Sequence, residues 1–187
     1  MERIKILALS GSLRQASYNT AALKALRELA SDDVDIVVYK GLGNLPLFNP
    51  DLEGQVILAF DELRSVLAKS HGLIIASPEY AHGISGVLKN TLDWLVSGEE
   101  FVYMPVALIN TSPRATHAQE ALREVIKTMS GSIIEKSCVS IPLLSSNLDA
   151  NGIVNDQVIS ALLKSSLFDF CEEIRKVRLN TTKKHHD

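Results

Sequence analysis

The sequence predicts an α/β fold, in which a doubly wound sheet of five parallel strands carries helices on both faces. Two observations lead to this prediction. Short apolar runs alternate with helical patterns five times along the chain. The runs consist almost entirely of Val, Ile, Leu and Ala, which is typical of strands that are covered on both faces. The predicted strands span residues 4–9, 34–39, 73–77, 106–110 and 137–142.

Between these runs, apolar residues recur at intervals of three and four, as on the buried face of an amphipathic helix. The periodicity predicts helices over residues 22–30, 56–67, 84–95, 118–129 and 159–170. In a doubly wound sheet, ligands bind beyond the carboxyl ends of the strands, where the strand order reverses. We therefore expect the chemistry of this protein in the loops after strands one, three and four.

Composition limits the class of protein. A length of 187 residues with 46% hydrophobic content fits one domain, which we place at residues 1–178, followed by a polar tail at 179–187. No run of about 18 apolar residues suggests a membrane span, and a net charge of −3 argues against a nucleic-acid-binding surface. We expect neither a membrane nor a nucleic acid as a partner.

Two further features predict a cytoplasmic protein. The chain enters its first strand directly, without the basic and apolar segments of a secretory signal. Cys138 and Cys171 have no metal-binding or redox spacing, so we expect buried free thiols. The short polar run 183–187 contains two histidines, which we interpret as a frayed end and not as a metal site.

The turn after the first strand carries the strongest functional signal. A turn from a strand into a helix aims free backbone N–H groups and the positive end of the helix dipole at one point. Around that point the sequence adds hydroxyl, guanidinium and carboxamide groups, which are suited to bind a phosphate. The candidate ligand-binding residues are Ser10, Ser12, Arg14, Ser17, Asn19 and Thr20. The alternative is an ordinary helix capped by Ser17 or Asn19.

The kind of phosphate follows partly from what this turn lacks. It has no Lys-Ser/Thr pair after a glycine-rich loop, which argues against a triphosphate-binding loop. Its single glycine, Gly11, also excludes the three-glycine fingerprint of dinucleotide sites. A monophosphate held by hydroxyls and backbone groups fits better, and flavin mononucleotide (FMN) is the common one in sheets of this kind.

The loop after the third strand can frame a flavin ring. Its backbone amides offer donors to the ring edge where reduction places negative charge. Tyr80 and His82 can pack against the ring. Alternatively, Tyr80 is a half-buried packing residue and His82 is a solvated one. Lys89 offers a positive charge to the reduced flavin or to a partner subunit. The candidate cofactor-binding residues here are Pro78, Glu79, Tyr80, Ala81, His82 and Gly83.

A second Ser/Thr-rich turn follows the fourth strand. Thr111 and Ser112 are candidates to flank the pyrimidine end of the flavin, with Arg114 or His117 near a second ligand. The alternative is a capped helix that begins at Ser112 or at residue 116. The proline-rich loop 45–51, after the second strand, either contacts a neighbouring subunit or packs on its own surface.

Three blocks of the sequence resemble the NADPH-dependent FMN reductase family, the flavodoxin-like group that includes chromate, quinone and azo-dye reductases. They are the turn 11–19, the loop 45–51 and the segment 78–94. The resemblance implies the flavodoxin-like strand order 2-1-3-4-5. The family often has Asn-Tyr-Ser-x-Pro where this chain has residues 81–85, Ala-His-Gly-Ile-Ser. We expect backbone groups to bind FMN despite this change. The change should instead affect which substrates bind over the flavin.

The resemblance also implies an activity. FMN binds near the subunit interface of a homodimer or homotetramer, and NADPH or NADH stacks on its exposed face. Hydride passes to flavin N5, and electrons then leave to a small-molecule acceptor such as a quinone, free flavin, an azo compound or chromate. The cofactor does the chemistry, so no side chain is assigned as a catalytic acid or base, although Arg14 can also meet the phosphate of NADPH. The alternatives are a flavodoxin-type electron carrier, for which a charge of −3 is mild, and a non-catalytic flavin-binding module.

Overall fold

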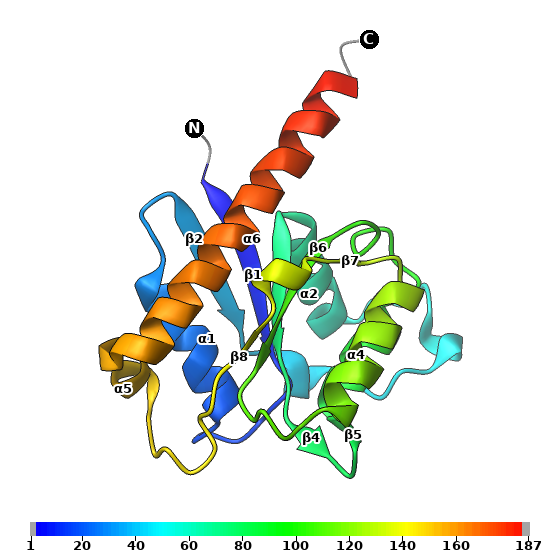
Figure 1. Ribbon diagram of the computed structural model, residues 1–187. Coiled ribbons are helices and arrows are strands. Elements are labelled where there is room, and N and C mark those ends of the chain that lie inside the picture. The colour runs from blue at the N-terminus through cyan, green and yellow to red at the C-terminus, as the bar shows by residue number, and fades with distance from the viewer. Residues whose placement is uncertain (1–2, 185–187) are drawn as a thin grey trace.

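The computed structural model describes residues 3–184, except for the side chains of residues 181–184, and it confirms the predicted fold class (Figure 1). A parallel sheet has the strand order β2-β1-β3-β6-β7, and β8 also pairs with β6. With β6 as the fourth strand and β7 and β8 as the fifth, this is the predicted order. The four long strands are β1 (Ile4–Ser10), β2 (Val34–Tyr39), β3 (Gly72–Ala76) and β6 (Pro105–Asn110).

The fifth strand was predicted wrongly as one continuous run over residues 137–142. It consists of two short pieces, β7 (Ser132–Ile133) and β8 (Val139–Ser140), separated by the 3₁₀ turn Glu135–Ser137. Both pieces pair in parallel with β6. This strand lies at the edge of the sheet, where an interrupted strand costs few hydrogen bonds and discourages pairing with other chains.

The helices cover the sheet in two layers. Side chains of β1 alternate between them: Ile6 and Ala8 face one apolar cluster, and Leu7 and Leu9 face the other. The first layer contains α1 (Tyr18–Leu29), α5 (Ala150–Asn155) and α6 (Gln157–Lys184). The second contains α2 (Leu58–Ala68), α3 (Gly86–Leu95) and α4 (His117–Thr128). Two separate cores therefore hold the sheet, as its apolar strands predicted.

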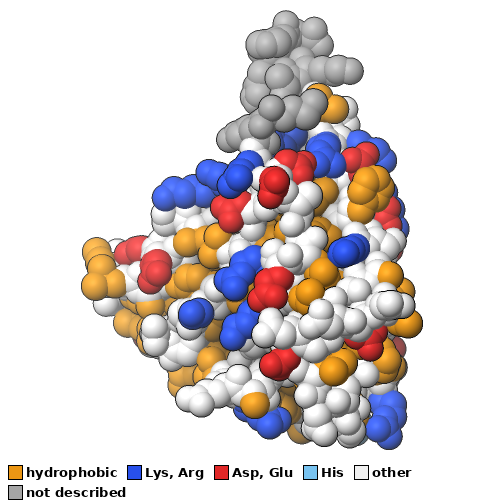
Figure 2. Space-filling view, turned by 90° about the vertical axis from the view of Figure 1, so that its left-hand side faces the viewer, with side chains coloured by type: hydrophobic (Ala, Val, Ile, Leu, Met, Phe, Trp, Pro, Cys, Tyr) orange, Lys and Arg blue, Asp and Glu red, His pale blue; other side chains and the backbone are white. Residues whose placement is uncertain are grey.

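The last helix is longer than the sequence predicted. In Figure 1 the end of α6 projects beyond the body of the molecule. Residues 179–184, which we assigned to a polar tail, continue this helix, and residues 185–187 lie outside the described part of the chain. None of the described helices is both long and apolar enough to cross a bilayer. Figure 2 looks at the side that carries β2, α1 and α5, where basic and acidic side chains are interspersed.

The loop 45–51 is attached to α3 by polar contacts. Asn90 Nδ2 donates to the carbonyl of Pro46 at 2.9 Å, and its Oδ1 accepts from the backbone N–H of Phe48 at 2.7 Å. Trp94 Nε1 donates to the same Pro46 carbonyl at 2.8 Å, and its buried ring contacts Phe48 edge-on. The loop is thus packed on its own subunit, yet it leaves Leu47 83% exposed.

Candidate cofactor-binding site

The turn after β1 lies directly against the end of β3. The backbone N–H of Gly11 donates to the carbonyl of Ala76 at 2.8 Å. A Cβ atom at position 11 would lie 2.6 Å from Ser77 Oγ and 3.0 Å from Ser77 Cβ. Position 11 therefore requires glycine because of this close approach, and the single glycine of the turn fixes its place beside the third strand.

The hydroxyls of this turn accept hydrogen bonds from its own backbone. Ser10 Oγ accepts from the N–H of Ser12, Ser12 Oγ from that of Arg14, and Ser17 Oγ from that of Thr20, each at 3.4 Å. Ser10 Oγ also lies 2.8 Å from Thr20 Oγ1. A hydroxyl that accepts keeps its own proton to donate. Ser17 thus serves as the N-cap of α1, and its O–H, like that of Ser12, can still donate to a phosphate.

One side-chain hydrogen bond joins the turn to the loop after β6. Thr111 Oγ1 donates to Asn19 Oδ1 at 3.0 Å, and both residues are buried. The N–H of Ser112 donates to Asn110 Oδ1 at 3.0 Å, which folds this second loop against the end of its own strand. The two Ser/Thr-rich turns that the sequence singled out therefore form one polar surface.

The loop after β3 forms a β-hairpin that the sequence did not predict. Its strands are β4 (Glu79–Tyr80) and β5 (Gly83–Ile84), and their pairing engages part of the backbone that we expected to face a flavin. The central residues Ala81 and His82 have φ angles of 49° and 59°. Consecutive left-handed residues are typical of a type I′ turn, which favours Asn-Gly. Because Ala-His carries no such signal, the hairpin was not predictable locally.

Glu79 points its carboxylate at α4. Glu79 Oε2 accepts from the backbone N–H of Ala118 at 2.9 Å, and Oε1 lies 3.2 Å from His82 Nδ1. The N–H of Ala118 and, less strongly, His82 and His117 lower the pKa of Glu79. The N-cap residue Thr116 makes no side-chain capping bond, so Glu79 takes that role from another loop. Ser112, the other predicted cap, does not start the helix.

A cleft of about 190 Å³ opens where the loops after β1, β3 and β6 meet. We call it the cofactor cleft, after the role that the sequence predicts for it. Nine of the predicted residues line it: Ser12, Arg14, Ser17, Asn19, Pro78, Glu79, Tyr80, Thr111 and Ser112. Sequence reasoning missed four more, which carry no motif of their own: Tyr18, Ser77, Ala115 and Leu144. A side hollow of about 440 Å³ adjoins the cleft and shares Arg14 and Tyr80 with it.

The other predicted residues lie around this cleft without lining it. Ser10 and Thr20 support the turn from behind through their shared hydroxyl contact. Ala81, His82 and Gly83 form the outer end of the hairpin, where the ring of His82 meets that of His117 edge-on at a centroid distance of 4.6 Å. A contact of these three residues with a flavin stays a prediction.

Comparison with known proteins identifies the family. Residues 4–143 match the sequence profile described as NADPH-dependent FMN reductase. The chain belongs to this family. An NAD(P)H-dependent FMN reductase from Pseudomonas aeruginosa is 30% identical over 181 residues, covering 94% of this chain and 97% of the relative. A quinone reductase from Escherichia coli is 25% identical over 187 residues, covering 95% and 99%.

A solved structure agrees with this assignment. The flavoenzyme NAD(P)H:(acceptor) oxidoreductase from Paracoccus denitrificans superposes with a TM-score of 0.79 at 25% identity, covering 92% of this chain and 98% of that one. The predicted resemblance to the NADPH-dependent FMN reductase family is thus confirmed. So are the predictions of an oxidoreductase and of FMN with NAD(P)H as cofactor and co-substrate.

The cofactor cleft fits FMN by its own chemistry. Hydroxyls, backbone N–H groups and the guanidinium of Arg14 are donors that suit a phosphate. Glu79 is the acidic residue among those that line the cleft, and its carboxylate is bonded to the N–H of Ala118 on α4. At Gly11 the missing side chain lets the turn lie close to β3.

Proposed function

We propose that this enzyme takes electrons from NADPH or NADH and passes them, through bound FMN, to a quinone. One observation carries the proposal: three loops that are far apart in the sequence build a single cofactor cleft at the carboxyl ends of β1, β3 and β6. Ligands of doubly wound sheets bind at this place. FMN, when bound, supplies the two-electron chemistry that links a nicotinamide to an acceptor.

The residues of the cleft bind and orient the cofactor in this proposal. Ser12, Arg14 and Ser17 hold the phosphate through donors at the start of α1. The bond between Asn19 and Thr111 fixes the spacing of the first and third loops. Backbone groups of the loop after β3 meet the polar edge of the ring. No side chain is given a proton-transfer role.

The side hollow supports a quinone as the acceptor. Leu13 and Tyr80, which are 65% and 50% exposed, line it together with Gly86 and Val87. A largely apolar wall with an aromatic ring favours a flat, weakly polar molecule. Several relatives, including those from Escherichia coli and Arabidopsis thaliana, are named quinone reductase or NADPH:quinone oxidoreductase. Free flavin, azo compounds and chromate stay secondary candidates.

We also propose that the enzyme is a homodimer or homotetramer in the cytoplasm. Leu47, Val56 and Leu58, which lie between β2 and α3, are each at least 80% exposed. A second subunit that covers these side chains would remove their apolar surface from water. The free thiols Cys138 and Cys171 favour a reducing compartment.

The activity is tested by following NADPH and NADH oxidation in the presence of FMN and benzoquinone. We expect oxidation well above a protein-free control, and reduction of bound FMN by NADPH alone. Protein that binds FMN but is reduced only by another reductase would be an electron carrier, which contradicts the proposal. Protein that binds no flavin would contradict it as well.

A further inference from the structure

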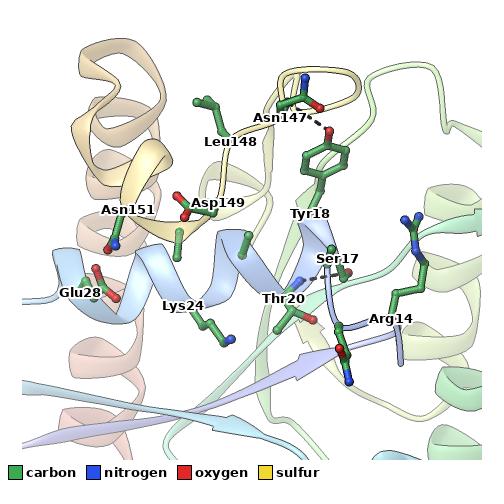
Figure 3. A pocket seen from close by; sticks show the side chains of 14 residues that line it. Arg14, Ser17, Tyr18, Thr20, Lys24, Glu28, Asn147, Leu148, Asp149 and Asn151 are labelled. Atoms are coloured by element: carbon green, nitrogen blue, oxygen red, sulfur yellow. Dashed lines mark hydrogen bonds between the residues drawn. The ribbon is translucent and has the colours of Figure 1, made fainter.

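A cavity of about 590 Å³ lies outside the cofactor cleft, between α1 and the segment 147–151 that leads into α5 (Figure 3). We call it the α1 cavity. Its volume is within the range of small-molecule binding sites. Tyr18 connects its two walls, because the Tyr18 hydroxyl accepts a hydrogen bond from the backbone N–H of Asn147 at 3.2 Å. Phosphate binding at the turn after β1 does not account for this cavity.

Two cations of the α1 cavity have no anionic partner. The guanidinium of Arg14 and the ammonium of Lys24 make no ion pair or side-chain hydrogen bond with any residue that the structure describes. Other cations, such as Arg123 and Lys136, are paired with carboxylates. Unpaired cations on a concave surface favour anionic ligands, and phosphate is the common biological one. With Arg14 at the FMN phosphate, Lys24 is left to bind a phosphate of a second ligand.

The opposite end of the α1 cavity has different chemistry. Figure 3 shows Arg14 at one end, and Glu28 with Asn151 at the other. The carboxylate of Glu28 and the amide of Asn151 suit hydroxyl and amino groups, and not a phosphate. Asp149 is engaged locally, since its Oδ1 accepts from the N–H of Gly152 at 2.8 Å and caps α5. The ligand should thus carry phosphate at Lys24 and polar neutral groups toward Glu28.

The α1 cavity also adjoins the cofactor cleft. Arg14, Ser17 and Tyr18 line both spaces. A ligand that occupies the α1 cavity can therefore extend over Arg14 toward the flavin. A nicotinamide dinucleotide has this construction, with a reactive ring at one end, a diphosphate in the middle, and a ribose and adenine at the other end.

We propose that the α1 cavity binds the adenosine diphosphate half of NADH, with Lys24 bound to its phosphates and Glu28 and Asn151 facing the ribose hydroxyls and the adenine. This proposal rests on the proposed function and adds to it the place where the co-substrate is held. Lys24 is a binding residue for the co-substrate and has no contact with the reacting atoms.

Reduced nicotinamide mononucleotide distinguishes the proposed role of the α1 cavity from the proposed activity, because it carries the reactive ring and lacks the adenosine half. For Lys24→Gln in the FMN-loaded enzyme, we expect kcat/KM to fall about tenfold with NADH and less than about twofold with the mononucleotide, as for the loss of one charge-assisted hydrogen bond. Lys164→Gln, an exposed lysine on α6, is the matched control and should change neither value. An equal loss with dinucleotide and mononucleotide, or no loss with either, would overturn the proposal.

A binding measurement tests the α1 cavity without catalysis. ADP-ribose lacks the nicotinamide, and calorimetric titration of the FMN-loaded protein should show it binding, about tenfold more weakly to Lys24→Gln and unchanged to Lys164→Gln. Unchanged ADP-ribose affinity in Lys24→Gln would overturn the proposal. If neither dinucleotide nor mononucleotide is oxidised, the proposed function fails by itself, while this titration still decides on the cavity.

Discussion

The turn after β1 and the hairpin after β3 lie on the same cleft, but they are held in different ways. In the turn, the hydroxyls of Ser10, Ser12 and Ser17 accept from backbone groups at most three residues away. In the hairpin, Glu79 reaches across to Ala118 on α4, 39 residues along the chain. The turn begins with the buried residues Gly11 and Ser12 and fits against its surroundings through that glycine. The hairpin is exposed at its tip and has two non-glycine residues with positive φ.

The difference shows which part of such a site a local sequence can specify. A turn that satisfies its own backbone is determined by the residue types within it. A hairpin whose central residues disfavour the left-handed conformation must be held in it by neighbouring elements. The four predictions below test this contrast, from the largest expected effect to the smallest.

Gly11→Ala should damage the turn most. The added Cβ would lie 2.6 Å from Ser77 Oγ and 3.0 Å from Ser77 Cβ, so the turn and Ser77 must shift relative to each other. Strain of this kind destabilises by about 1–3 kcal/mol, and we expect it to weaken FMN binding too. Urea unfolding and a flavin titration measure the two effects. Gly86→Ala is the control, since a Cβ there meets nothing within 4 Å at the start of α3, and it should be neutral or stabilising.

Arg14→Ala should weaken FMN binding by about 1–3 kcal/mol, the contribution of a charge-assisted hydrogen bond, because the phosphate loses one donor. Stability should not change, since the guanidinium makes no side-chain hydrogen bond or ion pair with the rest of the described chain. Flavin fluorescence quenching measures the affinity. Arg27→Ala, in the last turn of α1, should leave it unchanged. Unchanged affinity in Arg14→Ala would mean that Arg14 does not contact the phosphate.

Glu79→Gln should destabilise the protein in a way that depends on pH. The fold lowers the pKa of Glu79 below its usual 4.5. The stabilisation by ionised Glu79 is therefore complete above its pKa in the unfolded chain. It is lost as the pH falls through its pKa in the folded protein. The difference in unfolding free energy between wild type and variant should be largest near neutral pH and should shrink as the pH falls below 4.5, the usual pKa of the carboxyl. Glu99→Gln, on the surface, serves as the control. A difference that stays constant with pH would show that the charge of Glu79 has no part in holding α4.

Ala81→Gly should stabilise the hairpin slightly. Alanine at φ 49° is in the left-handed region, which costs an L-residue about 1–2 kcal/mol, while glycine loses about 0.5–1 kcal/mol of chain entropy. The balance is a gain of about 0.5–1 kcal/mol, measurable as a higher melting temperature. Ala161→Gly, at an exposed position on α6, should instead lower the stability by about 1 kcal/mol. A loss in both variants would mean that the turn is not strained.

Much of the fold followed from the sequence because its signals are local and repeated. The strands β1, β2, β3 and β6 are apolar runs of five to seven residues, and the helices between them have regular apolar spacing. The last strand was predicted less well. At the sheet edge, Glu135 and Lys136 interrupt it without harm, since an edge strand pairs on one side only.

The cofactor cleft could be predicted in part for a similar reason. Residue types single out the turn after β1 as a predicted phosphate site, because hydroxyls and a guanidinium together are suited to bind a phosphate. The destination of the Glu79 carboxylate depends on where α4 begins, which no spacing encodes. Tyr18, which lines both the cleft and the α1 cavity, is an ordinary first helical residue until the segment at Asn147 folds onto it.

The bond between Asn19 and Thr111 bears on the order of events during synthesis. The two partners are separated by 92 positions, and Thr111 directly follows β6, which pairs with β3. A nascent chain that has left the ribosome only as far as α3 has the phosphate turn but not the wall that faces it. Capture of the vitamin-derived cofactor therefore waits until more than half of the polypeptide has emerged.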